Sequence, residues 1–291
     1  MPELPEVEVT RRRIAPFLVG RRVRRLRTTR PSYFFVTPPA RLRRALAGRS
    51  VSALERMGKY LCARLDDGSQ LVLHLGMTGQ LFSAGASSLR LLSAAARAAL
   101  PPEAQRSFRP DLHTHLRFEF DDGGPEVYLR DARKFGKAMW LAPGQAHPRL
   151  ARLGTDALAM DGDALFAATR GRRVAIKSLL LDQAVIAGVG NIYADEALFL
   201  AGVRPTRRAG RVTRRESGAI VAGLLRVLQR SIETGGSSIS DYVAPDGSDG
   251  AYQSESRVYA RRGEPCTVCA TPIARVLLGA RGTHYCPRCQ R

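Results

Sequence analysis

Lysine is scarce in this sequence, although positive charge is not. It occurs only at positions 59, 134, 137 and 177, whereas Lys and Arg together number 46 against 26 Asp and Glu in 291 residues, a formal net charge of +20. A surplus of this size predicts a polyanionic partner such as nucleic acid, and no basic amphipathic helix with a wide apolar face favours a membrane surface instead. Because an ammonium group can lose its proton in a site and a guanidinium cannot, each lysine is a candidate functional residue.

Long apolar runs are also missing. No window reaches about 18 uninterrupted apolar residues, which predicts the absence of a transmembrane helix. No apolar run follows a basic segment at the N-terminus, which predicts the absence of a secretory signal. Cysteine is rare, and four of the five cysteines cluster near the C-terminus, which indicates metal binding in a reducing cytoplasm rather than a disulfide framework.

The clustered cysteines form two Cys-x-x-Cys pairs, Cys266/Cys269 and Cys286/Cys289, with sixteen residues between the pairs. This spacing predicts two turns of a β-hairpin that hold one tetrahedral Zn²⁺ ion. The zinc is expected to be structural, because four thiolates leave no open coordination position. His284 is an alternative ligand and more simply a neighbour of the site. Cys62 lies in a predicted strand and is expected to be a buried, small apolar residue.

The pattern of apolar residues and turn signals predicts one helix followed by short antiparallel strands, and then a mostly helical segment. The predicted strands are Gly20–Arg30, Val51–Met57, Tyr60–Leu65, Gln70–Leu75, Leu116–Phe120, Val127–Arg130 and Lys137–Leu141. Further helices are predicted at Ala40–Leu46, Val174–Leu181, Ile192–Leu200 and Arg214–Ile232. The expected fold class is therefore α+β, with an N-terminal helix plus an antiparallel β-sandwich domain, then a helical domain and a zinc-finger β-hairpin.

The domain organisation predicted from these elements has three parts. They are a β-sandwich domain at 1–142, a helical domain at 147–253 and a zinc finger at 257–291. Residues 84–114, rich in Ala, Ser, Arg and Pro, are expected to form a surface insertion, with a small helix at Leu89–Ala99 as the alternative. Residues 235–253 are rich in Gly, Ser and Asp and are expected to form a loop.

The first residues, Met-Pro-Glu-Leu-Pro-Glu-Val-Glu, point to chemistry at the chain terminus. If Met1 is removed, Pro2 carries a free secondary amine that can attack an electrophilic carbon, and the resulting iminium has no N–H to lose. Glu3 is adjacent and can pass a proton to or from the reacting centre. The structural alternative is that acids and Pro are favoured in the first turn of any helix.

Several motifs together carry a family resemblance. Residues 2–8 resemble the N-terminal signature of the bacterial formamidopyrimidine-DNA glycosylases, which repair oxidised purines. The run 183–196, which contains Gly-Val-Gly-Asn, resembles their helix-two-turn-helix motif. The strings His-Leu-Gly-Met-Thr-Gly at 74–79 and Asp-Ala-Arg-Lys-Phe-Gly at 131–136 extend the resemblance to nearly the whole chain apart from 84–114.

The resemblance implies a role for each matching residue. It makes Pro2 the nucleophile and Glu3 the acid/base, and it makes Lys59 a phosphate ligand that assists catalysis, with its amine as the alternative nucleophile. Glu6 is expected to shape the electrostatics of the site. For DNA binding the resemblance implies phosphate contacts, a flanking lysine and side chains that fill the space left by a flipped nucleotide. These DNA-binding residues are His74, Asn191, Arg281, Lys177, Met77, Arg133 and Phe135.

The implied activity is a base-excision-repair DNA glycosylase with AP lyase activity. It would excise 8-oxoguanine and formamidopyrimidines from duplex DNA through a Pro2 Schiff base and β,δ-elimination, with loop 235–253 closing over the flipped base. The protein is expected to be a monomer with one structural Zn²⁺, located at the nucleoid in the bacterial cytoplasm. The alternatives are an endonuclease VIII-like glycosylase for oxidised pyrimidines and a non-catalytic zinc-finger protein that binds damaged DNA. An RNA-binding zinc ribbon explains neither the N-terminus nor the motif around Asn191.

Overall fold

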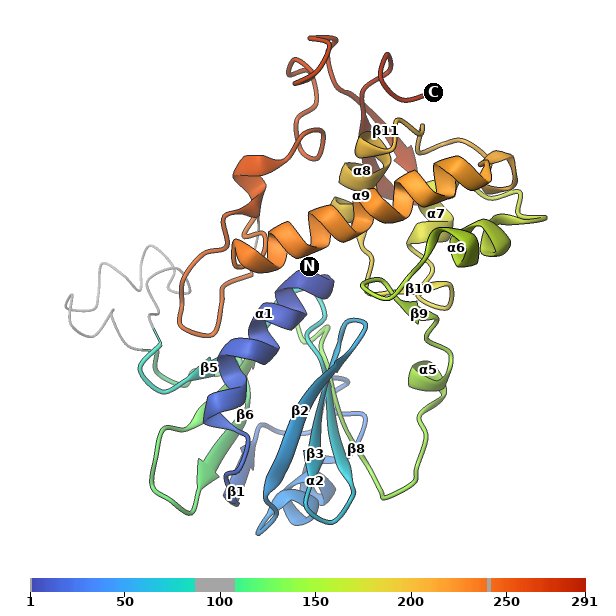
Figure 1. Cartoon of the computed structure of the whole chain (residues 1–291). Helices are drawn as coiled ribbons and strands as arrows, with labels where there is room; N and C mark the ends of the chain where they lie inside the picture. Colours follow the sequence, from blue (N-terminus) through green and yellow to red (C-terminus); the bar gives the residue numbers. More distant parts are fainter. Residues whose placement is uncertain (1, 87–107, 240–241) are drawn as a thin grey trace, which may run out of the picture. The chain divides into compact units, whose positions relative to one another are not determined.

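A computed structural model describes residues 2–86, 108–239 and 242–291 (Figure 1). The chain divides into two compact units. The first unit contains residues 1–147 and Gly235–Ala251, and the second contains Pro148–Thr234 and Tyr252–Arg291. The alternative helix at Leu89–Ala99 and most of the expected insertion lie outside the described residues.

Helix α1 (Leu4–Ile14) opens the first unit and continues into the short 3₁₀ helix η1 (Ala15–Phe17). Pro lies in its first turn together with the acidic Glu6, and three arginines lie in its last turn, so both ends complement the helix dipole. Leu4, Val7 and Ile14 are completely buried and form the apolar face that the sequence predicts.

In the described residues the first unit has two four-stranded antiparallel sheets. The strands of one sheet are, in spatial order, β1 (Val23–Thr28), β6 (Thr114–Phe120), β7 (Val127–Asp131) and β5 (Gly79–Ser83). The strands of the other are β2 (Val51–Met57), β3 (Tyr60–Leu65), β4 (Gln70–His74) and β8 (Lys137–Leu141). A short helix, α2 (Pro39–Leu46), follows β1 in the chain. The predicted antiparallel sandwich is therefore confirmed.

One continuous apolar core joins the two sheets to α1 and α2. Val7 of α1, Leu42 of α2 and Leu26, Leu61 and Leu129 of the strands belong to the same buried cluster. Because this core holds the strands in place, the turns at their ends have fixed positions, and these turns carry the polar side chains described below.

The two ends of the expected insertion meet. The Phe108 N–H donates to the Ala86 carbonyl at 2.6 Å, and the Phe108 ring stacks on Phe82 with 4.9 Å between centroids. The described residues on the two sides of positions 87–107 therefore meet beside β5.

The second unit is mainly helical, as predicted. Its helices are α5 (Pro148–Ala151), α6 (Gly162–Thr169), α7 (Ile176–Leu180), α8 (Asn191–Leu200), η2 (Ala209–Arg211), α9 (Arg214–Glu233) and η3 (Tyr252–Glu255). Its strands are β9 (Thr155–Asp156) paired with β10 (Ile186–Ala187), and β11 (Ala274–Leu278) paired with β12 (Arg281–Tyr285). No helix among the described residues combines the length and apolar character needed to span a bilayer.

The loop that begins at Gly235 differs from the predicted division of the chain. The division expected from sequence groups 235–253 with the helical segment, whereas Gly235–Ala251 belongs to the first unit. Arg13 of α1 holds this loop through its guanidinium, which donates to Asp246 at 2.9 Å and to Ser248 at 2.8 Å. Long-range polar contacts of this kind have no periodic signal in the sequence.

Glu8 supplies the electrostatic link between α1 and the strand β2. Burial alone would raise the pKa of this carboxyl, but hydrogen bonds from Arg11 and Arg12 and the charge of Arg56 outweigh burial and lower the pKa to about 2. The folded protein therefore holds Glu8 ionised more firmly than the unfolded chain does. The stabilisation is complete above the unfolded pKa near 4.5 and is lost as the pH falls toward 2.

We predict that Glu8→Gln lowers the free energy of unfolding at pH 7 by about 2–4 kcal/mol, because it removes the buried carboxylate charge shared by Arg11, Arg12 and Arg56. The variant should also lose less stability than wild type between pH 5 and pH 2. Denaturant titrations at both pH values measure this difference. Glu55→Gln is the matched control, since Glu55 pairs with Arg64 on the exposed face of β2 and β3, and it should change stability by less than about 1 kcal/mol. Equal effects of the two substitutions would contradict the assignment.

Candidate active site and metal centre

Pro2 and Glu3 are both buried at the start of α1. The Glu3 N–H donates to the Glu6 carboxylate at 2.8 Å, and the other oxygen of that carboxylate accepts the Ser237 N–H at 2.9 Å. Glu6 itself is 1% exposed. One carboxylate thus fixes the chain terminus to the loop that begins at Gly235, and it does so through main-chain atoms of both.

Glycine is required where this loop meets α1. Gly236 has φ +89°, and a Cβ at this position would lie 3.0 Å from the Tyr242 ring and 3.1 Å from Cγ of Glu6. The Tyr242 hydroxyl donates to the Glu6 carbonyl at 3.3 Å. The Gly-Gly pair therefore allows the loop backbone to approach α1 closely enough for the Ser237 contact.

The turn between β2 and β3 carries Lys59, which is 9% exposed. Arg56 precedes this turn and donates to the Gly58 carbonyl at 3.2 Å and to the Glu8 carboxylate at 3.2 Å. The turn that presents Lys59 is therefore tied to α1, the helix that directly follows Pro2 and Glu3.

His74 ends β4, and its ring lies against Tyr60 with 4.8 Å between centroids. Its Nδ1 accepts the Gly76 N–H at 3.1 Å. This bond places the ring proton of the neutral histidine on Nε2, which makes Nε2 a hydrogen-bond donor.

The loops that carry Met77 and Phe135 pack backbone against backbone. A Cβ on Gly76 would lie 2.4 Å from both the Gly136 nitrogen and the Phe135 carbonyl carbon, so only glycine allows this approach. Met77 and Phe135 remain 37% and 42% exposed, and the Arg133 guanidinium lies 4.6 Å from the centre of the Phe135 ring. The three residues that sequence reasoning grouped by resemblance are thus presented by two adjoining loops.

Sequence reasoning missed Asp131 and Tyr33. Asp131 is completely buried, and its carboxylate accepts the Gly136 N–H at 2.7 Å, the Arg133 N–H at 3.3 Å and the Thr78 hydroxyl. Tyr33 is 58% exposed, and its hydroxyl donates to the Arg133 carbonyl at 2.5 Å. The Asp-x-x-x-x-Gly spacing is a signal for Asp131 as a turn-forming residue, whereas nothing local connects Tyr33 to a loop 100 residues away.

In the second unit, Asn191 is the first residue of α8 and follows the Gly190 N-cap. Its side-chain amide donates to the Gly282 carbonyl at 3.2 Å and lies 3.4 Å from the Tyr259 hydroxyl. Arg281 is exposed at the start of β12, one residue before Gly282. Asn191 and Arg281, more than 80 residues apart in sequence, are thus held beside one another.

Lys177 lies behind this arrangement rather than on the surface. It is fully buried, and its ammonium donates to Asp195 at 2.7 Å, Thr283 at 2.9 Å and the Gly282 carbonyl at 3.2 Å. A fully buried ammonium group is not exposed to DNA, so the structure does not support the expected direct contact of Lys177 with DNA. Instead, the side chain holds the hairpin that carries Arg281 against α8.

Glu196, next to Asp195 in α8, is a second buried acid that holds the same region. The Glu196 carboxylate accepts the N–H groups of Arg257, Val258 and Tyr259 at 2.8–3.1 Å. Burial raises the pKa of Glu196, and the three N–H donors act in the opposite direction. Glu196 fixes the approach of the chain to the hairpin and positions Tyr259 beside Asn191.

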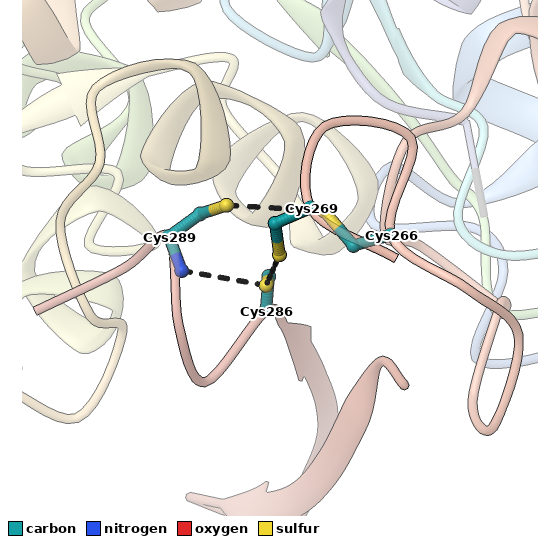
Figure 2. Close-up of side chains that lie close together, drawn as sticks. All are labelled: Cys266, Cys269, Cys286 and Cys289. Carbon is teal, nitrogen blue, oxygen red and sulfur yellow. Dashed lines mark hydrogen bonds between the residues drawn. The ribbon is translucent and has the colours of Figure 1, made fainter. Parts of the chain in front are cut away.

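The four C-terminal cysteines converge at one point (Figure 2). Their sulfur atoms all lie within 4.8 Å of one another, with 3.9 Å between Cys266 and Cys289 and 3.4 Å between Cys269 and Cys286. A tetrahedral Zn²⁺ with Zn–S bonds of about 2.3 Å needs sulfur separations of about 3.8 Å, so the donor set fits one zinc ion. Because every ligand is a thiolate from the protein, the zinc is structural and the predicted cofactor is confirmed.

His284, the alternative ligand, and Cys62, the fifth cysteine, both lie outside this centre. The His284 N–H donates to Asp195 at 2.8 Å, and the ring lies against Tyr259 rather than in the cysteine group. Cys62 is 1% exposed in β3, and burial raises the pKa of its thiol to about 11. Cys62 is the inert apolar residue that the sequence predicts.

We predict that the purified chain holds one zinc ion and that Cys266→Ser holds far less than one, since three thiolates bind the ion more weakly. Elemental analysis of protein dialysed against a mild chelator measures the zinc content. Cys62→Ser is the matched control and should retain the metal. Equal zinc contents in the two variants would contradict the assignment of the ligands.

Three family models match successive parts of the chain. Residues 1–138 match the formamidopyrimidine-DNA glycosylase N-terminal domain, residues 153–243 match the formamidopyrimidine-DNA glycosylase H2TH domain, and residues 263–291 match the zinc finger found in FPG and IleRS. The formamidopyrimidine-DNA glycosylase of Burkholderia thailandensis is 43% identical over 297 residues, which cover 100% of both chains.

Solved structures of DNA complexes are similar over the same length. A mutant of the Lactococcus lactis enzyme bound to DNA containing Fapy-dG has a TM-score of 0.85 at 31% identity, with 100% of both chains covered. MutM bound to DNA containing carbocyclic 8-oxo-G has a TM-score of 0.84 at 31% identity, again over 100% of both chains. Since the matches extend over both units and the zinc centre, the chain belongs to the formamidopyrimidine-DNA glycosylase family.

Proposed function

We propose that this protein is a DNA glycosylase and AP lyase that excises oxidised purines, including 8-oxoguanine and formamidopyrimidines, from duplex DNA. The observation that carries the proposal is the N-terminus: Pro2 and Glu3 are buried directly before α1, whose Glu6 anchors both the terminus and the Gly235 loop. Membership of the family over the full chain and the DNA lesions bound by its relatives support the same substrate.

The proposed chemistry begins at the Pro2 nitrogen once Met1 has been removed. The amine attacks C1′ of the damaged nucleoside, the glycosidic bond breaks, and the base leaves with the bonding electrons and a proton. Glu3 protonates the sugar ring oxygen as the ring opens. The Pro2–C1′ iminium then acidifies the C2′ proton, so the 3′ phosphate and afterwards the 5′ phosphate are eliminated.

Each unit is proposed to supply phosphate ligands of its own. In the first unit Lys59, on the turn tied to α1 by Arg56, offers an ammonium group, and His74 offers the Nε2 donor that the Gly76 contact selects. In the second unit Asn191 and Arg281 lie beside one another at the start of α8 and β12, where a helix N-terminus also favours an anion. Lys177 is proposed to act indirectly, by fixing the hairpin that presents Arg281.

The space left by the flipped nucleotide is proposed to be filled by Met77 and Phe135, with Arg133 facing the orphaned base. Exposed apolar side chains on two adjoining loops suit insertion into a base stack. The Arg133 guanidinium lies over the Phe135 ring, so its N–H donors are held beside the side chain that is proposed to enter the base stack. We also propose a location at the nucleoid in the bacterial cytoplasm, because the proposed substrate is chromosomal DNA and zinc-bound thiolates suit a reducing compartment.

We predict that borohydride traps a covalent complex between wild-type protein and DNA containing 8-oxoguanine, and that Pro2→Gly abolishes at least about 99% of it. Lys59→Ala should slow trapping without abolishing it, since Lys59 binds phosphate and is not the nucleophile. Denaturing gels measure the shifted band, and peptide mass spectrometry locates the adduct. Full trapping by Pro2→Gly with none by Lys59→Ala would reverse the assignment of the nucleophile.

We predict that Gly76→Ala reduces kcat/KM for 8-oxoguanine excision by about 10- to 100-fold, since it forces apart the loops that carry Met77 and Phe135. Single-turnover kinetics and thermal unfolding measure the loss. Gly123→Ala is the matched control, because Gly123 has φ +66° against +64° for Gly76 but has no atom within 4 Å of the added Cβ. Similar losses of activity in both variants would show that backbone strain, rather than loop contact, sets the effect.

A further inference from the structure

The first unit has a second basic surface, away from the residues proposed for catalysis. An open hollow of about 660 Å³ is lined by α2, the turn before β2 and the end of β8. Its charged and aromatic lining residues are Arg22, Arg41, Arg44, Arg49, Asp67 and Trp140. We call this surface the arginine hollow.

Strand register places the arginine hollow at the opposite end of the sheet from Lys59. Tyr60, His74 and Lys137 are paired neighbours at one end of β3, β4 and β8. Trp140 pairs with Leu71 near the other end, where Asp67 lies in the β3–β4 turn. Five residue steps along β3 span about 17 Å, so a duplex bound at Lys59 and His74 does not occupy the hollow through the same phosphates.

The charge of the hollow is only partly compensated. Arg49 pairs with Asp67 at 3.2 Å, and Arg22 pairs with Asp121 at 3.6 Å. Arg41 and Arg44 have no acidic partner among the described residues, and α2, which carries both, contains no acidic residue. Two guanidinium groups are therefore available to an anionic partner, while Asp67 is neutralised by its own arginine.

Trp140 gives the hollow a fixed aromatic wall. Its indole N–H donates to the Ser69 hydroxyl at 3.0 Å, and the Arg41 guanidinium lies 5.0 Å from its ring. Trp140 is also the single tryptophan of the sequence. Its fluorescence therefore reports directly on whatever enters the arginine hollow.

We propose that the arginine hollow is a second, sequence-independent binding surface for the phosphate backbone of duplex DNA. Arginines spread over an open face suit a repeating polyanion better than a single small ligand, which needs an enclosed pocket. The protein would then hold an undamaged DNA segment at one end of the sandwich while the other end engages a lesion. This surface adds to the proposed function and does not depend on the proposed chemistry.

The test is a titration of Trp140 fluorescence with a short undamaged duplex at low salt. Wild type should show saturable quenching, and Arg41→Gln/Arg44→Gln should weaken the affinity measured by this signal by about tenfold. The slope of log affinity against log salt should fall by about 2 in the double variant, one for each lost phosphate contact. Arg24→Gln/Arg25→Gln, on β1 outside the hollow, is the matched control and should leave the Trp140 signal unchanged.

A second measurement asks whether one molecule holds two duplexes. The borohydride-trapped complex should capture a labelled second duplex, and Arg41→Gln/Arg44→Gln should trap normally but lose this capture. Pro2→Gly should keep the Trp140 signal while it loses trapping, which separates failure of this inference from failure of the proposed function. The inference is overturned if duplex binds without changing Trp140 emission, if the double variant quenches like wild type, or if only a polyglutamate peptide changes the signal.

Discussion

Buried carboxylates that accept main-chain N–H groups hold three of the segments around the residues proposed to act on DNA. Glu6 binds the amides of Glu3 and Ser237, Asp131 binds those of Arg133 and Gly136, and Glu196 binds three successive amides that end at Tyr259. All three side chains are at most 2% exposed. A buried carboxylate loses its hydrating water, and the main-chain donors that replace this water also hold the loop backbone in place.

Acidic and basic residues have different roles in this protein: several acids are buried anchors, whereas the basic residues supply the charge for a polyanionic partner. The chain has 46 basic residues for a polyanionic partner and only 26 acidic residues, and several of the acids are withdrawn from the surface to act as anchors. Burial of these acids leaves more of the surface charge positive, and their hydrogen bonds hold the loop backbones in place. Rigid presentation matters for a site that must distort a duplex, because a side chain ordered in advance loses less entropy when it inserts into a base stack.

Three of the four lysines lie at specific places in the structure. Of the four lysines, Lys177 is fully buried in an ion pair with Asp195, and Lys59 is 9% exposed on the turn tied to α1. Lys137 lies 4.7 Å from the Tyr33 ring, close to the Arg133 loop. In a sequence that uses arginine for most of its positive charge, Lys177 is thus an internal residue that binds an acid, a hydroxyl and a carbonyl at once.

Sequence by itself determined most strands of the sandwich, the main helices and the zinc ligands, because each depends on local patterns. These patterns are short apolar segments bounded by turn signals in β2 and β3, 3.6-residue periodicity in α9, and Cys-x-x-Cys spacing around Cys266 and Cys286. The strand β5 was not predicted. Family resemblance, rather than periodicity, singled out Met77, Arg133 and Phe135. Only the tertiary structure decided that Gly235–Ala251 joins the first unit, that Lys177 is buried, and that Tyr33 reaches the Arg133 carbonyl. The physical reason is that these contacts join segments up to 231 residues apart, as in the Glu6–Ser237 bond, through single donors and acceptors that leave no repeating pattern in the chain.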